Sequence, residues 1–292
     1  MQQNGTLTDY SPASHETGSS WSILSPIELS IKRKIEAVGK PLKDWDIKIY
    51  RGILTGCNEA FIIDGAKREE ILNKCLSAAE RERTDALIRP ILRGRDIKRY
   101  KAEWAGLYVL NVHNGIKEKN IPSIKIEEYP AIKAHLDLYW DKIAKRSDKG
   151  DTPYNLRNCV YMEDFLKQKI VWAETMRMTK SNVNNFPRFA VVDNGIFTDK
   201  TAFIGRGKQL DKMCTVLNSE FAIFWFINNV AVLDNGGFCM SKIYIENIPI
   251  PNLSKINNEE DVYTAFGFSD DEITFIKSVV ARRKEEIVNG AD

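Results

Sequence analysis

The sequence contains no long apolar segment. Its longest uninterrupted apolar run covers seven residues, Phe221 to Ile227, and two asparagines end it. A membrane-spanning helix needs about 20 consecutive apolar residues, so the sequence predicts none. The first 20 residues are polar and lack the apolar stretch of a secretory signal. We therefore expect a cytoplasmic protein with no membrane partner.

Cysteine and histidine are scarce and scattered. The five cysteines form no Cys-x-x-Cys pair, and the three histidines do not lie at the spacing of metal ligands. These absences argue against a zinc knuckle and a disulfide scaffold. An odd number of cysteines without a secretory signal favours reduced thiols that pack as small hydrophobic side chains. The sequence predicts no metal site.

Familiar catalytic motifs are absent as well. The chain has no Gly-x-x-x-x-Gly-Lys-Ser/Thr phosphate loop and no Gly-x-Ser-x-Gly nucleophile turn. It also lacks a glycine-rich loop for S-adenosylmethionine and the Asn-Pro-Pro-Tyr/Phe tetrapeptide with which adenine methyltransferases hold a flipped base. Asp46 and Lys48 match the local spacing of a metal-dependent nuclease, but no suitable carboxylate precedes them. The pattern is typical of a binding module that depends on another domain for catalysis.

The chain does have an ordinary globular composition with unevenly placed charge. Of its 292 residues 43% are hydrophobic, enough for a sizeable core, and the formal net charge is +2. Residues 81–101 carry eight Lys/Arg against three Asp/Glu, and residues 142–208 carry thirteen against seven. Residues 254–292 reverse this balance, with five against nine. A basic body suits the phosphates of a nucleic acid, although a solvated mixed surface is the alternative.

Hydrophobic spacing predicts an α+β fold. Ser25-Pro26, followed by apolar residues at positions 27, 31, 35 and 38, predicts a helix that ends near Gly39. A capping box at Ser269–Glu272 predicts a last helix, and two further helices are expected at 67–79 and from Pro130. The apolar segment 208–229 predicts one or two more. Strands are expected at 44–50, 60–64, 106–112, 169–175, 188–195, 201–205 and 243–252. We expect a mixed sheet with flanking helices over 22–252, a loose leader over 1–21, and an acidic linker and C-terminal helix over 253–292.

Three stretches carry a resemblance to a known family. They are IYRGILTGCNEAFIID at 49–64, IRPILRGRDIKRY at 88–100, and LNS at 217–219 followed by IPIP at 248–251. In this order they resemble the TaqI-like C-terminal specificity domain, over roughly residues 22–288. That domain is the target-recognition module of adenine-specific DNA methyltransferases and type IIG restriction–modification enzymes. The resemblance implies that 22–252 recognises DNA. It also implies a methyltransferase domain or subunit as partner, and that partner, rather than this chain, would bind S-adenosylmethionine.

The first stretch supplies one candidate DNA-binding loop. Arg51, Thr55 and Asn58 can form hydrogen bonds with phosphate or a base edge. Gly52 and Gly56 allow close approach of the backbone to a partner. The alternative is a tight turn in which Asn58 only caps the backbone.

The second stretch is the most specific part of the resemblance. Gly94 turns the chain so that the flanking arginines point in different directions. For Arg95 we weigh an internal clamp with Asp96 against contact with DNA, because a buried carboxylate needs a cationic partner. A guanidinium can also bind phosphate or guanine through two parallel hydrogen bonds. The predicted DNA-binding residues here are Arg93, Arg95, Lys98, Arg99 and Tyr100, with Gly94 and Asp96 in structural roles.

A third candidate loop follows the strand predicted at 169–175. Lys180, Asn182 and Asn184 lie in it, and asparagine can bond adenine through two hydrogen bonds. The alternative is an ordinary solvent-exposed loop.

From these observations we predict sequence-specific binding of double-stranded DNA that positions an adenine for a methyltransferase domain outside this chain. Three alternatives stay open. The chain is a piece of an adenine-specific methyltransferase or type IIG restriction enzyme that acts only with its catalytic domain. It is a module whose basic face binds RNA or an acidic protein, which a preference for single strands would indicate. Or it is an inactive remnant.

Overall fold

The computed structural model describes residues 24–234 and 236–290, so the leader predicted over 1–21 lies outside the described residues. At the centre is a four-stranded antiparallel sheet in the order β2 (Ile47–Arg51), β10 (Ala202–Gly207), β6 (Lys169–Ala173) and β8 (Phe189–Val192). Successive side chains of a strand point to opposite faces. Ile170 and Trp172 therefore enter one hydrophobic core, and Val171 enters a second core on the other face.

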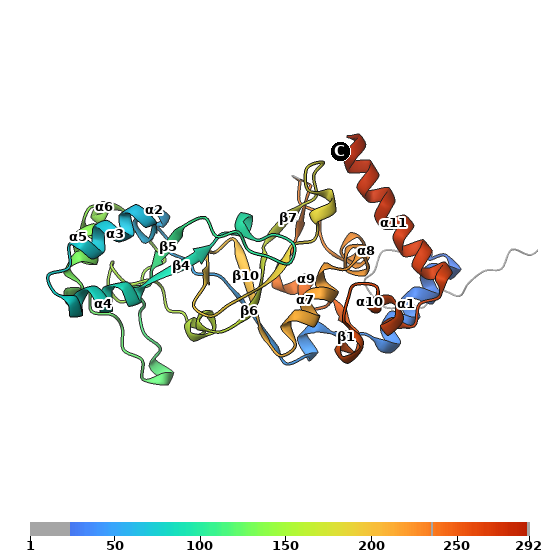
Figure 1. Ribbon diagram of the computed structural model, residues 1–292, viewed down its shortest axis with the longest axis horizontal. Coiled ribbons are helices and arrows are strands. Elements are labelled where there is room, and N and C mark those ends of the chain that lie inside the picture. Colours follow the sequence, from blue (N-terminus) through green and yellow to red (C-terminus); the bar gives the residue numbers. More distant parts are fainter. Residues whose placement is uncertain (1–23, 235, 291–292) are drawn as a thin grey trace, which may run out of the picture.

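The second core lies between the central sheet and a smaller sheet. The smaller sheet has the order β3 (Ile62–Asp64), β5 (Leu107–Leu110), β4 (Ile88–Leu92) and β9 (Phe197–Thr198). Its β4–β9 pair is parallel and the others are antiparallel, so this sheet is mixed. The helices at this end of the molecule are α2 (Asn58–Phe61), α3 (Gly65–Asn73), α4 (Ala78–Leu87), α5 (Pro130–Asp137) and α6 (Trp140–Ile143) (Figure 1).

Most of the remaining helices gather at the other end, around the first core (Figure 1). They are α1 (Pro26–Val38), α7 (Leu210–Asn218), α8 (Glu220–Asn229), α9 (Lys242–Ile245), α10 (Asp261–Phe266) and α11 (Asp270–Asn289). Two short strand pairs complete this half, β1 (Lys40–Pro41) with β12 (Pro249–Ile250) and β7 (Thr175–Arg177) with β11 (Gly237–Cys239). The fold is α+β, as the sequence predicts.

Local capping residues set several helix ends where the sequence places them. Ser25 and Glu28 form a capping box at α1, and Ser269 and Glu272 form one at α11. The apolar segment 208–229 forms two helices, because Ser219 ends α7 and caps α8. The acidic C-terminal segment also packs inward, since side chains of α10 and α11 are part of the first core.

Two predicted strands begin as helical turns instead. The segment 60–64 starts in α2, where Phe61 is fully buried, and becomes a strand only at Ile62. The segment 243–252 starts in α9, where the Asn247 side chain donates a 2.7 Å hydrogen bond to the Ile243 carbonyl. Burial and a local side-chain hydrogen bond here override β-propensity.

Glu272 joins the two ends of the described chain. Its carboxylate lies 2.7 Å from Lys34 Nζ and accepts a 2.6 Å hydrogen bond from Ser30, both on α1. Burial raises the pKa of this carboxyl, but the hydrogen bonds from Lys34, Ser30 and Ser269 outweigh that effect and bring its pKa down to about 2.

We expect Glu272→Gln to destabilise the fold at neutral pH and to be nearly neutral in strong acid. The folded pKa lies below the ordinary value, so the unfolded chain binds more protons in acid. The stabilisation by Glu272 is therefore complete above about pH 4.5 and disappears towards about pH 2. Urea unfolding of both proteins at about pH 7 and about pH 3 measures the difference. A difference of the same size at both pH values would contradict this prediction.

Within the described residues, no helix is long and apolar enough to cross a membrane.

Candidate nucleic-acid interface

Two of the three candidate segments meet at one end of the central sheet, where β2 and β6 end and β10 begins. Gly52 N–H donates to the Ala202 carbonyl (2.8 Å), and Gly94 N–H donates to Thr201 Oγ1 (2.8 Å). Arg51 donates from Nε to the Lys200 carbonyl (3.0 Å) and forms an ion pair with Glu174. The turn at 93–96 therefore lies directly beside the end of β2, although the two are far apart in sequence.

Both glycines at this junction are in close contact with backbone. A Cβ atom on Gly52 would lie 1.9 Å from the Asp199 carbonyl oxygen, and one on Gly94 would lie 2.8 Å from the Thr201 carbonyl oxygen. Any side chain at Gly52 would force the strands apart. Gly56 differs, because it adopts a left-handed φ of 68° in an exposed turn.

Residues 93–103 form a hairpin-like loop that we call the finger. Its two arms are joined by hydrogen bonds from Glu103 N–H to the Asp96 carbonyl (2.8 Å) and from Lys98 N–H to the Lys101 carbonyl (2.8 Å). The finger contains five cations and two carboxylates. Lys98 is partly exposed, and its ammonium donates to the Arg95 carbonyl (2.8 Å).

The clamp expected between Arg95 and Asp96 is instead formed by Arg93. Arg93 donates from Nε and Nη2 to the two carboxylate oxygens of Asp96, each at 2.9 Å, and its N–H donates to the same group (2.8 Å). The 3-10 turn at Gly94–Asp96 folds Asp96 back onto residue 93 and turns Arg95 outward. Arg95 is exposed, and its guanidinium forms no hydrogen bond or ion pair with any residue that the structure describes.

This contact changes the titration of Asp96. Burial raises the pKa of the carboxyl, but the hydrogen bonds and positive charge of Arg93 outweigh it, so the pKa lies below its ordinary value. Asp96 therefore stays ionised near neutral pH and needs its cationic partner.

The other two predicted contacts in the finger, Arg99 and Tyr100, form hydrogen bonds within the protein, although Tyr100 is 44% exposed. Arg99 donates from Nη1 to the Asn218 carbonyl (2.5 Å) and from Nη2 to Glu259 Oε1 (2.5 Å). Tyr100 donates its hydroxyl proton to the same Glu259 oxygen (2.6 Å). Contact of Arg93 or Arg99 with DNA stays a prediction, and it would require each guanidinium to exchange a carboxylate for a phosphate.

An arginine that the sequence analysis did not identify, Arg146, supports the Thr55–Asn58 loop. Arg146 is buried and donates from Nη1 to the Thr55 carbonyl (2.5 Å), while its guanidinium lies 4.4 Å from the centre of the Phe61 ring. Burial brings the pKa of Arg146 down to about 10. Thr55 is itself buried and donates to Asn58 Oδ1 (2.5 Å), which leaves Asn58 as the exposed member.

The third candidate loop lies against α11 through its 3-10 turn at Val183–Asn185. Asn182 shapes the loop, because its side chain accepts from Thr179 N–H (2.9 Å) and donates to the Arg177 carbonyl (3.2 Å). Lys180 and Asn184 are exposed, and neither side chain forms a hydrogen bond within the described part of the chain.

Two further arginines lie beside this loop, and the sequence analysis did not identify either as a candidate. Arg177 is exposed, and Arg188 is half-buried and donates to the Arg177 carbonyl (3.3 Å). Burial lowers the pKa of Arg188. Within the residues described between 167 and 200, no lysine or arginine has a carboxylate partner within 4.0 Å; these are Lys167, Lys169, Arg177, Lys180, Arg188 and Lys200.

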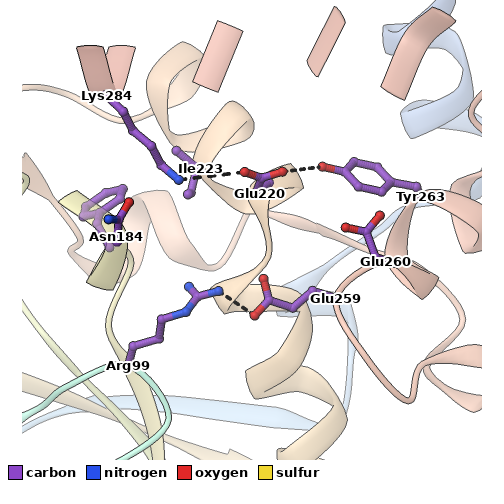
Figure 2. A pocket seen from close by; sticks show the side chains of 9 residues that line it. Arg99, Asn184, Glu220, Ile223, Glu259, Glu260, Tyr263 and Lys284 are labelled. Carbon is purple, nitrogen blue, oxygen red and sulfur yellow. Dashed lines mark hydrogen bonds and ion pairs between the residues drawn. The ribbon is translucent and has the colours of Figure 1, made fainter. Parts of the chain in front are cut away.

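A cavity of about 190 Å³ lies between the third loop and the helices α8, α10 and α11, with Arg99 at one side (Figure 2). Each of its three carboxylates has a cationic partner. Glu259 pairs with Arg99, and the other pairs are Glu220 with Lys284 (3.8 Å) and Glu260 with Lys277 (3.3 Å). The cavity therefore offers no unpaired charge to a ligand. Among all the described side chains, including those of this cavity, no group of three or more His, Cys, Asp or Glu could hold a metal ion.

Comparison with known proteins identifies the family of this chain. The sequence profile of the TaqI-like C-terminal specificity domain matches residues 89–250. The solved type IIG restriction endonuclease BpuSI is similar in fold, with a TM-score of 0.54 and 17% identity over 90% of this chain and 32% of that chain. The type IIL restriction-modification enzyme MmeI, solved in complex with DNA, has a TM-score of 0.55 and 11% identity over 86% of this chain and 36% of its own. This chain thus spans about a third of each enzyme. No curated protein matches it in sequence.

Proposed function

Because this chain belongs to the TaqI-like C-terminal specificity domain family, we propose that it recognises a specific site in double-stranded DNA. Cations contact the phosphates and set register and affinity, while a few loop side chains read base edges. A separate methyltransferase domain, which would bind S-adenosylmethionine, flips and methylates an adenine in the site that this module has positioned.

One observation carries the proposal. Arg95 and Lys200 lie on adjacent segments at the end of the central sheet, since Gly94 is hydrogen-bonded to Thr201. Both are exposed, and neither has a carboxylate partner in the described part of the chain. An exposed guanidinium and an exposed ammonium without carboxylate partners are suited to binding the phosphates of DNA.

We propose that the predicted contacts fall into two groups. The first group is exposed and suited to contact DNA; it consists of Arg95, Lys180, Asn184 and Asn58, with the partly exposed Lys98. The members of the second group form hydrogen bonds within the protein that keep the loops in shape. They are Thr55, Arg93, Arg99, Asn182 and Tyr100, of which Tyr100 is also exposed. In this proposal Arg51 belongs to both groups, because it is half exposed while paired with Glu174.

The double variant Arg95→Ala/Lys200→Ala is expected to bind duplex DNA at least about tenfold more weakly at low salt. The slope of log K against log salt should become shallower by about 2, because each lost phosphate contact removes about 1. Fluorescence anisotropy over a salt series measures both quantities, with circular dichroism as a check of the fold.

Lys117→Ala/Lys125→Ala is the matched control. It removes the same charge from two exposed lysines that have no carboxylate partner in the described structure, on the segment between β5 and α5. An equal loss in both double variants would show non-specific charge attraction and would contradict the proposed surface. Tighter binding of single strands than of duplex by the unaltered protein would favour the RNA-binding alternative.

A further inference from the structure

The Leu-Asn-Ser stretch places one asparagine at the junction between α7 and α8. Asn218 is fully buried. Its Oδ1 accepts a hydrogen bond from Phe189 N–H (3.1 Å), and its Nδ2 donates to the Phe189 carbonyl (2.9 Å). β8 is the last strand of the central sheet, so the Asn218 amide pairs with this edge as the peptide group of a further strand would.

The tip of the finger, formed by Arg99 and Tyr100, contacts the same two residues, Phe189 and Asn218. Tyr100 N–H donates to the Phe189 carbonyl (2.9 Å), and Arg99 Nη1 donates to the carbonyl of Asn218 itself (2.5 Å). The edge strand β8, the α7–α8 junction and the finger tip are therefore joined through two residues that contact each other, Phe189 and Asn218.

Glu259 holds the finger tip from the other side. It accepts from both Arg99 (2.5 Å) and Tyr100 (2.6 Å), and Figure 2 shows the contact with Arg99 at the side of the cavity. Tyr100 has a left-handed φ of 64°, which is costly for a residue with a Cβ and persists only where the surroundings impose it. These contacts supply that constraint.

We propose that Asn218 and Arg99 are positioning residues that fix the finger relative to the central sheet, and so fix the place from which Arg95 and Lys98 reach DNA. The DNA part of this inference rests on the proposed function. Reading a base edge tolerates displacements of only about half an ångström, whereas a phosphate contact is far more tolerant. A loosened finger should therefore lose sequence discrimination while keeping most of its salt-dependent affinity.

The first test needs no DNA. Asn218→Asp is nearly isosteric and keeps Oδ1, but it replaces the donor that faces the Phe189 carbonyl with an acceptor. We expect amide hydrogen exchange at Tyr100 to become at least tenfold faster, while the protection of β6 is retained. Asn228→Asp is the control, since it makes the same chemical change on α8, where the Asn228 side chain is exposed and bonds the Phe224 carbonyl (2.7 Å).

A second variant covers the case in which Asn218→Asp does not fold. Arg99→Gln/Glu259→Gln removes the ion pair without leaving either charge unpaired, and the same rise in exchange at Tyr100 is expected. Unchanged exchange at Tyr100 in a folded variant overturns the positioning role, whatever the protein does with DNA.

The second test compares affinity for the preferred duplex with affinity for random duplex. In Arg99→Gln/Glu259→Gln we expect this ratio to fall at least tenfold with an unchanged salt slope. A slope shallower by about 1 would mean that Arg99 contacts phosphate, and this would overturn the positioning role. If the unaltered protein shows no sequence preference, the proposed function fails, and the exchange experiment still decides whether the finger is held as proposed.

Discussion

Gly52→Ala is expected to destabilise the protein by about 3 kcal/mol or to prevent folding. The added Cβ would lie 1.9 Å from the Asp199 carbonyl oxygen and 2.6 Å from the Thr198 carbonyl oxygen. Both atoms belong to backbone, so no side-chain rotation can relieve the overlap. The hydrogen bonds that bring β2 against the start of β10 would have to break, and the candidate interface would separate with them. Urea unfolding measures the change.

Gly65→Ala is the matched control for this prediction. Gly65 begins α3, and a Cβ there would meet nothing within 4 Å. Alanine also restricts the unfolded chain more than glycine does, so this variant should be neutral or stabilised by up to about 1 kcal/mol. Equal stabilities of the two variants would contradict the close contact assigned to Gly52.

Arg93→Ala is expected to cost about 3 kcal/mol of stability, because it leaves the Asp96 carboxylate buried without its cation. The Asp96 side chain is only 7% exposed, whereas that of Arg93 is 23% exposed. Because Arg93 is partly solvated, we expect a loss of stability at the lower end of the range for breaking a buried ion pair. The loss should shrink as the pH falls through the lowered pKa of Asp96, since protonation removes the charge that Arg93 neutralises. Urea unfolding at neutral and acid pH measures both effects.

Arg95→Ala separates this structural role from DNA binding. Arg95 is two residues away and carries the same charge, but its guanidinium is exposed and has no partner among the described residues. Its replacement should change stability by less than about 0.5 kcal/mol while weakening DNA binding. If Arg95→Ala unfolded the protein and Arg93→Ala did not, the clamp assigned here would be wrong.

The contrast between these two arginines shows what the sequence could and could not predict. It identified Gly94 as a turn and Asp96 as the partner of an arginine, because those are local preferences of the residue types. Which arginine pairs with Asp96 depends on the direction of the turn. Gly94 sets that direction by bonding to Thr201, about a hundred residues further along the chain.

The same contrast between local signals and long-range contacts applies to the helices, strands and supporting residues. The first and last helices were predicted closely, since capping residues and apolar stripes are local signals. Strand β6 was predicted from its β-prone residues, which are buried on both faces. By contrast, Arg146 supports a loop some ninety residues before it in sequence, and no short-range pattern marks that contact. Asn218 belonged to the stretch that carried the resemblance, but its pairing with β8 is visible only in the folded chain.

The central claim, that this module recognises a specific duplex site, is tested most directly by selection from a pool of random duplexes at two salt concentrations. We predict an enriched motif, and binding whose logarithm falls with log salt at a slope of roughly −5, as expected for about six phosphate contacts. Recovery of no motif from duplex that the protein does bind at low salt, or a failure to bind duplex at low salt, would contradict the claim.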